Sequence, residues 1–200
     1  MQSMASFAAV AALCLCALAG CIAKSDEAKK TDAPLVVSAS VAQFTEGGAL
    51  AVPADLDKWI FLGSSLGMGY SQQSFDPNSP GMFQIVQMEP GAYAAFMRDG
   101  EFPDGAMFLL SFYESANQIS INRSGFVMGE AMSYEIHLKD KSRFPETGFN
   151  FYTFGPGDAS APEVPLPNSC VECHTRDGAH DGVFTQFYPG PRDRLAAKPQ

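Results

Sequence analysis

The chain has 200 residues, with 22 acidic and 13 basic side chains, a net charge of -9 and a pI of about 4.7. A negatively charged chain without a cluster of lysine and arginine repels a phosphate backbone, so nucleic acid is excluded as a partner. The length suits one domain with its own hydrophobic core.

The first twenty residues carry no charged side chain, and the apolar run between Phe7 and Ala19 is too short to span a bilayer comfortably. Such a run is typical of a signal peptide, and it ends in "LAGC", which resembles the bacterial lipobox. We therefore expect residues 1–20 to be a lipoprotein signal peptide and Cys21 to carry the lipid. A plain secretory signal and an interior hydrophobic helix are the alternatives.

Residues 21–34 are polar, charged and free of aromatic side chains, which predicts a flexible tether between a membrane surface and a domain at residues 35–200. The protein is then exported and anchored by its lipid on the periplasmic side of a bacterial membrane. Ile22 and Ala23 follow Cys21 in place of the aspartate that resembles an inner-membrane retention signal. The outer membrane is therefore the favoured location.

Short strands and helices alternate along the predicted domain. Residues 53–63 combine a short helical turn with an apolar stretch, and apolar runs predict strands over residues 82–88, 106–113 and 149–154. A helix is predicted over residues 90–98, because a proline stands in its first turn and a glycine follows its end. Mostly antiparallel strands with a few short helices define a β-dominated α+β fold.

The longest regular pattern predicts a strand over residues 126–138. One face carries an apolar row with Glu130 in register, and the other carries small and polar side chains as far as His137. We expect the apolar row to face the core and His137 to meet solvent. A carboxylate in an apolar row is costly unless it is paired or protonated. Glu130 is therefore either a catalytic, proton-handling residue or a structural one, turned outward by a β-bulge or paired with Arg143 or Lys139.

Near the C-terminus, the stretch "NSCVECHTRDGAH" brings together Cys170, Cys173 and His174. It follows a proline-rich loop, and Asn168 or Ser169 can cap a helix at this point. Helical positions three and four apart share one face, so the three side chains project toward the same object. With the signal peptide removed and Cys21 lipidated, no other cysteine remains in the mature chain.

This spacing matches C-x-x-C-H, the attachment signature of c-type haem. In that chemistry two thiols bond to the haem vinyl groups, and the imidazole ligates the iron. A disulfide between Cys170 and Cys173 would close a strained small loop, a thioredoxin-like pair would need a βαβ context, and zinc would need further ligands. The sequence therefore predicts a covalently attached haem c with His174 as the iron ligand.

The role of such a haem depends on its sixth coordination position. An electron-transfer cytochrome has both axial positions filled, whereas a gas-binding or catalytic haem leaves one open. His137 is expected in solvent, and His180 follows His174 too closely to reach the opposite haem face. A methionine is harder to exclude as sixth ligand, although most methionines of the domain are expected to fill the core.

Five blocks occur in an order and spacing similar to those of the cytochrome P-460 family, which includes the cytochromes c′-beta. They are "DLDKWIFLGSSLG", "FQIVQMEPGAYAAFMRDGEFPDG", "GFVMGEAMSYEIHLKDKSRF", "GFNFYTF" and "CVECHTRDGAHDGVFTQFYP", within residues 53–189. The resemblance implies a homodimer of antiparallel β subunits. Each subunit would hold one haem through Cys170 and Cys173, with His174 as proximal ligand and a vacant distal side.

In the hydroxylamine-oxidising members of that family, a lysine a few residues after the "DG" turn cross-links to the haem. Leu110 occupies the matching position here, and residues 106–132 contain no lysine. The resemblance therefore favours a cytochrome c′-beta, which binds nitric oxide or carbon monoxide in an apolar pocket. An apolar wall tolerates small gases but offers bound dioxygen no hydrogen bond. Phe83, Phe102, Phe108 and Leu110 are the candidates for that wall.

Three functions stand as hypotheses. The first is an exported, membrane-tethered haem protein that binds nitric oxide or carbon monoxide. The second is an enzyme that oxidises hydroxylamine or nitric oxide and passes electrons to a soluble cytochrome docked on the acidic surface. The third is an electron carrier with methionine as its sixth ligand.

Overall fold

The structure is a computed structural model that describes residues 42–70 and 76–197. The predicted signal peptide, the predicted lipid-bearing Cys21 and the predicted tether lie outside these residues. No helix in the described part of the chain is long and apolar enough to cross a membrane.

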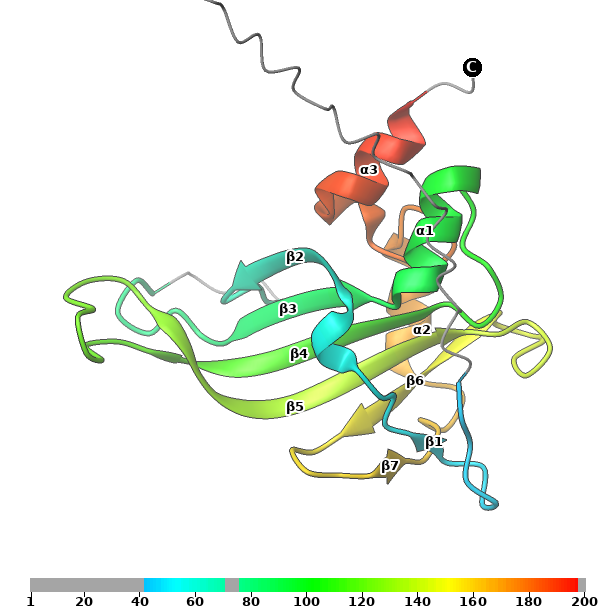
Figure 1. Cartoon of the computed structure of the whole chain (residues 1–200), viewed down its shortest axis with the longest axis horizontal. Helices are drawn as coiled ribbons and strands as arrows, with labels where there is room; N and C mark the ends of the chain where they lie inside the picture. The colour runs from blue at the N-terminus through cyan, green and yellow to red at the C-terminus, as the bar shows by residue number, and fades with distance from the viewer. Residues whose placement is uncertain (1–41, 71–75, 198–200) are drawn as a thin grey trace, which may run out of the picture. The chain divides into compact units, whose positions relative to one another are not determined.

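Five antiparallel strands form the main sheet, in which each strand pairs with the next along the chain (Figure 1). They are β2 (Ile60–Leu66), β3 (Phe83–Met88), β4 (Met107–Ala116), β5 (Val127–Lys139) and β6 (Phe149–Phe154). A separate two-stranded sheet pairs β1 (Leu50–Ala51) with β7 (Ser160–Ala161). Figure 1 shows the β4–β5 hairpin reaching well beyond the other strands.

Short helices accompany the sheet. The α-helices are α1 (Pro90–Asp99), α2 (Ser169–Asp177) and α3 (Pro189–Ala196), and the 3-10 turns are η1 (Leu56–Lys58) and η2 (Thr185–Phe187). α3 packs on β2 and α1, while α2 packs on β6. The predicted β-dominated α+β fold is confirmed, including a helix that carries the cysteine motif near the C-terminus.

The start and end of α1 follow from its sequence. The Glu89 carboxylate caps the helix by accepting the backbone N–H groups of Gly91 at 2.9 Å and Ala92 at 2.6 Å. Pro90 takes the first helical position, where a missing N–H costs nothing. Gly100 ends the helix with φ +79°, a conformation that suits glycine.

Opposite faces of the main sheet bury two different sets of side chains. On one face, Met107, Leu109, Ile136, Leu138, Tyr152 and Phe154 pack with Leu50 and Trp59. On the other face, Phe108 packs with Phe96, Phe102 and other residues around α1, and Phe149 and Phe151 pack with Val171 of α2. The second face, which meets all three α-helices, is the one that carries the cavity described below.

The face assignment of β5 is correct only for its second half. Ile136 and Leu138 lie in the core, as the alternation predicted, but Met128 and Met132 are about half exposed. The register of β5 against β4 shifts twice, opposite Tyr113, and residues before Tyr134 have no partner on β6. Extra residues in a strand change which face a side chain takes, and the unpaired half has no layer to cover it.

Candidate functional site

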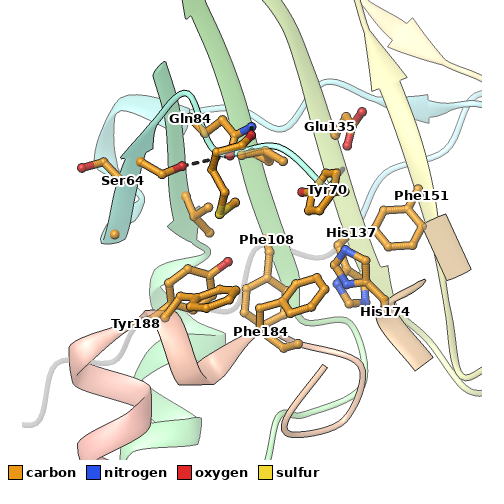
Figure 2. A pocket seen from close by; sticks show the side chains of 17 residues that line it. Ser64, Tyr70, Gln84, Phe108, Glu135, His137, Phe151, His174, Phe184 and Tyr188 are labelled. Atoms are coloured by element: carbon orange, nitrogen blue, oxygen red, sulfur yellow. Dashed lines mark hydrogen bonds between the residues drawn. The ribbon is translucent and has the colours of Figure 1, made fainter. Parts of the chain in front are cut away.

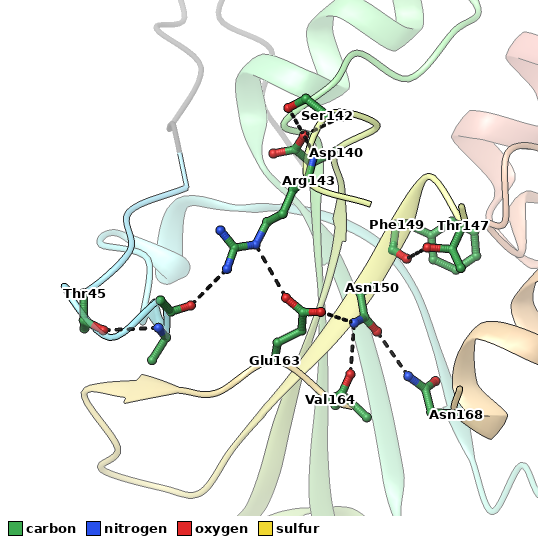
Figure 3. A network of polar contacts seen from close by, with 12 residues as sticks. Thr45, Asp140, Ser142, Arg143, Thr147, Phe149, Asn150, Glu163, Val164 and Asn168 are labelled. Carbon is green, nitrogen blue, oxygen red and sulfur yellow. Dashed lines mark hydrogen bonds and ion pairs between the residues drawn. The ribbon is translucent and has the colours of Figure 1, made fainter. Parts of the chain in front are cut away.

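The helix that carries the cysteine motif is anchored to the sheet through its N-cap. Asn168 accepts the N–H of Val171 at 2.8 Å, and its amide donates to Oδ1 of the buried Asn150 on β6 at 3.2 Å. Figure 3 shows how Asn150 continues this network to Glu163, which pairs with Arg143. The position of α2 is therefore fixed both by a cap and by a polar contact to a buried residue of the edge strand β6.

The two thiols of the motif are free and partly exposed. Burial and then the nearby Glu135 carboxylate raise the pKa of Cys170, and burial and then a hydrogen bond to Asp177 raise the pKa of Cys173. Redox-active C-x-x-C pairs have a thiol pKa below the ordinary value. The raised pKa of both thiols does not fit a redox pair, and it leaves both thiols protonated at neutral pH.

His174 is held by one hydrogen bond in a defined tautomer. Its Nδ1 lies 2.7 Å from the carbonyl oxygen of Gly182, which can only accept, so Nδ1 carries the proton. The lone pair of Nε2 is then available to a metal. Burial lowers the pKa of His174 despite this bond, which keeps the imidazole neutral as ligation requires.

His174 stands on the wall of a cavity of about 840 Å³, including the space at its open mouth (Figure 2). Strands β2 to β6, the residues that follow β2, helix α2 and the segment before α3 contribute the wall. Its residues are Gly63, Ser64, Ser65, Met68, Tyr70, Gln84, Val86, Phe108, Leu110, Glu135, His137, Phe151, His174, Val183, Phe184, Phe187 and Tyr188.

The structure places two of the four predicted wall residues on this cavity. Phe108 and Leu110 lie on its wall, one beside the other on the same face of β4. Phe83 does not line the cavity. Its neighbour Gln84 does, and successive residues of β3 point to opposite faces of the sheet. Phe102 is buried elsewhere, stacked on Phe96 of α1 with ring centroids 4.1 Å apart.

Glu130 is the clearest departure among the predicted site residues. Its side chain is exposed and lies outside the cavity wall, so the structure does not support a proton-handling role there. The register shift in this part of β5 corresponds to the predicted β-bulge. The predicted pairs are not formed, because Lys139 pairs with Asp181 and Arg143 with Glu163.

The carboxylate on the cavity wall is instead Glu135, which sequence reasoning missed. Glu135 is directly opposite Leu110 in the β4–β5 register, and burial raises its pKa. Gln84 is a second polar residue there: its side chain accepts a hydrogen bond from Ser65 at 2.9 Å and donates one to the carbonyl of Met68 at 3.1 Å. The wall is therefore mostly apolar with a few polar groups, rather than wholly apolar as expected.

His137 was predicted to meet solvent, and this is wrong. It is 5% exposed, and its ring centroid lies 5.2 Å from that of His174 in edge contact. Burial, reinforced by His174 and then Lys139, holds the pKa of His137 well below its ordinary value. Its Nε2 has no hydrogen-bond partner in the described part of the chain. The alternation did group His137 with Glu135, and the error was to assign that face to solvent.

These residues fit a haem. A neutral imidazole with an unprotonated Nε2 lies on the wall of a mostly apolar cavity, and two free thiols stand on the same helix face. A single protein nitrogen is enough for such a site, because the porphyrin supplies four ligands to its iron. The antiparallel sheet and this helix together define a haem protein of the cytochrome class.

Comparison with known proteins gives the family. The sequence profile of the cytochrome P460 family matches residues 53–185, and the chain belongs to that family. The protein is accordingly a haem cytochrome. The matched region includes β2 to β6, the whole of α2 and most of the cavity wall. No curated protein matches the chain at a significant level.

Proposed function

We propose that the protein is an exported, mono-haem c-type cytochrome whose distal position stays open and binds nitric oxide or a similar small gas such as carbon monoxide. One observation carries the proposal: His174, with its Nδ1–H fixed on Gly182, presents its other nitrogen to an open cavity with a largely apolar wall. A bound haem would supply an iron with one free coordination position. Cys170 and Cys173 would hold it through thioether bonds.

The position of His137 supports an open distal side. Two axial ligands must stand on opposite faces of a porphyrin. The rings of His137 and His174 are in edge contact, which leaves no space for a porphyrin between them. His137 therefore belongs to the proximal surroundings of His174 and is not the sixth ligand. Met68, which also lies on the cavity wall, is the residue through which the electron-carrier hypothesis would act.

A second candidate function is oxidation of hydroxylamine or nitric oxide, with electrons passed to a soluble cytochrome. Glu135 favours it, because it is a carboxylate on the cavity wall whose pKa is raised by burial, as is common for general acids and bases. Leu110 counts against it, since the resemblance places there the lysine that cross-links the haem in hydroxylamine-oxidising relatives. We therefore rank gas binding first.

Absorption spectra test the proposal directly. The full chain is produced in a host competent for cytochrome c maturation, and the reduced protein is measured with and without carbon monoxide. We expect a five-coordinate, high-spin spectrum that shifts when the gas is added. A sharp low-spin spectrum indifferent to carbon monoxide would refute both the gas-binding and the enzymatic proposal and favour Met68 ligation. Turnover of hydroxylamine with a chemical electron acceptor would place the second candidate first.

Covalent attachment has its own test. Acidified acetone extracts a haem that is not bonded to the chain, so the wild type should retain its colour in the protein pellet. The double variant Cys170→Ala/Cys173→Ala should release the haem or fail to incorporate it. Retention of haem by the double variant would show that the thiols do not hold it.

Export, a lipid on Cys21, the outer membrane as location and a homodimer complete the proposal. The signal-like residues 1–20 support export, and the family resemblance supports the dimer. Replacing residues 1–21 with a cleavable secretory signal should move the protein from the membrane fraction to the soluble periplasmic fraction. Light scattering on that soluble variant measures the oligomeric state, and a mass of one chain would contradict the dimer.

A further inference from the structure

A buried lysine at the end of β5 connects the sheet to the segment that follows α2. The Lys139 side chain is 7% exposed, and its ammonium donates to the carbonyl oxygen of Phe102 at 2.6 Å. It also forms an ion pair with the carboxylate of Asp181, whose side chain is 31% exposed. Removing an ammonium from water is costly unless it is paired, so Asp181 is held firmly beside Lys139.

Asp181 and Gly182 are the two central residues of a tight turn. His180 and Val183 close the turn through backbone hydrogen bonds, and both central residues have positive φ, +53° and +72°. Asp-Gly is a favoured pair for such a turn. Its second residue, Gly182, supplies the carbonyl that accepts the Nδ1–H of His174. One residue of the turn is thus fixed to the sheet, and the next fixes the imidazole.

We infer that the Lys139–Asp181 ion pair is a positioning element for His174, acting through the Gly182 carbonyl to set the orientation and basicity of the ring as an iron ligand. The inference rests on the proposed haem ligation by His174. The hydrogen bond on the far nitrogen of a metal-bound histidine governs how much electron density the ring gives the metal. Anything that holds the accepting carbonyl in place therefore acts on the iron.

Stability alone does not distinguish this role from a merely structural one, because breaking a buried ion pair destabilises a fold in either case. The distinguishing readouts are properties of the iron. A weaker Nδ1–H bond lowers the frequency of the iron–histidine stretching band in the reduced protein. It also makes the reduction potential more positive, since a less basic ligand stabilises the oxidised iron less.

The experiment compares Asp181→Asn and Lys139→Met with the wild type, each as the full chain loaded with haem. Resonance Raman spectra of the reduced protein give the iron–histidine band, and redox titration gives the potential. We expect both variants to shift the band to lower frequency and the potential upward. Lys139→Arg keeps the charge and should restore values close to the wild type. If a single variant does not fold, the neutral pair Lys139→Met/Asp181→Asn replaces it.

Arg143→Gln is the matched control. The Arg143 side chain is 30% exposed and pairs with Glu163 at 3.6 Å, so the substitution also neutralises one partner of a half-buried pair, while Glu163 keeps its hydrogen bond from Asn150. It should lower stability without moving the band or the potential. Folded, haem-loaded Asp181 and Lys139 variants with wild-type values for both readouts would overturn the inference. A wild type without haem, or without ligation by His174, would instead overturn the proposed function.

Discussion

Replacing Gly182 with alanine measures how tightly the turn beside His174 is built. Gly182 has φ +72°, and the left-handed region costs an L-residue about 1–2 kcal/mol. An added Cβ would also lie 2.5 Å from Cε1 and 2.7 Å from Cζ of the Phe149 ring. Overpacking of this kind costs about 1–3 kcal/mol. Together the two effects predict a loss of roughly 2–5 kcal/mol in the free energy of unfolding, a large part of the stability of a typical domain.

Urea denaturation followed by far-ultraviolet circular dichroism measures this loss, and Gly157→Ala is the matched control. Gly157 has φ +89°, but its added Cβ would meet nothing within 4 Å. The control should therefore lose about 1–2 kcal/mol, from backbone conformation alone. If Gly182→Ala lowers the free energy of unfolding no more than Gly157→Ala does, the Phe149 ring moves aside without cost. The tight packing inferred around the turn is then refuted.

Three further substitutions test the cap of α2, the buried carboxylate and the contact between α1 and α3. Asn168→Ala removes the acceptor for the N–H of Val171, and urea denaturation should show that the free energy of unfolding falls by about 1–2 kcal/mol. An unchanged free energy of unfolding would mean that water replaces the cap. Burial raises the pKa of Glu135, so the folded state binds a proton there more tightly than the unfolded state does. This stabilisation is complete below the ordinary glutamate pKa and is lost as the pH rises through the raised pKa of the folded state. Unfolding free energies measured against pH should therefore fall less steeply with rising pH in Glu135→Gln than in the wild type. Equal slopes for the variant and the wild type would contradict this reasoning. Arg194→Ala removes two hydrogen bonds to carbonyls at the end of α1, so the free energy of unfolding from thermal denaturation should fall by about 1–3 kcal/mol. An unchanged thermal midpoint would show that water replaces these bonds at no cost.

Helix α1 and the cysteine motif could be predicted because their signals are local. A proline in the first turn and a glycine beyond the end bounded α1 to within one residue of its observed Pro90–Asp99. The spacing of Cys170, Cys173 and His174 requires only a helix to place the three side chains on one face. The family resemblance drew on the same local blocks and is confirmed by the match over residues 53–185.

The cavity wall could not be predicted in the same way, because it depends on contacts between strands. Glu135 reaches the cavity because β5 pairs with β4 in the register that sets it opposite Leu110. A shift of one residue reverses every face of a strand, and the two register shifts of β5 opposite Tyr113 interrupt the alternation in the first half of the strand. Alternation in the sequence groups residues by face but does not say which face another layer will cover.

The sequence by itself determined the β-dominated fold class, the helix near the C-terminal end and the placing of two cysteines and a histidine on one face of that helix, since each follows from neighbours within a few residues. Only the tertiary structure decided that His137 is buried against His174, and that Asp181 is paired with a lysine 42 positions earlier in the chain. The physical reason is that burial and ion pairing depend on which distant segments pack together, and strand register and turn geometry settle that packing.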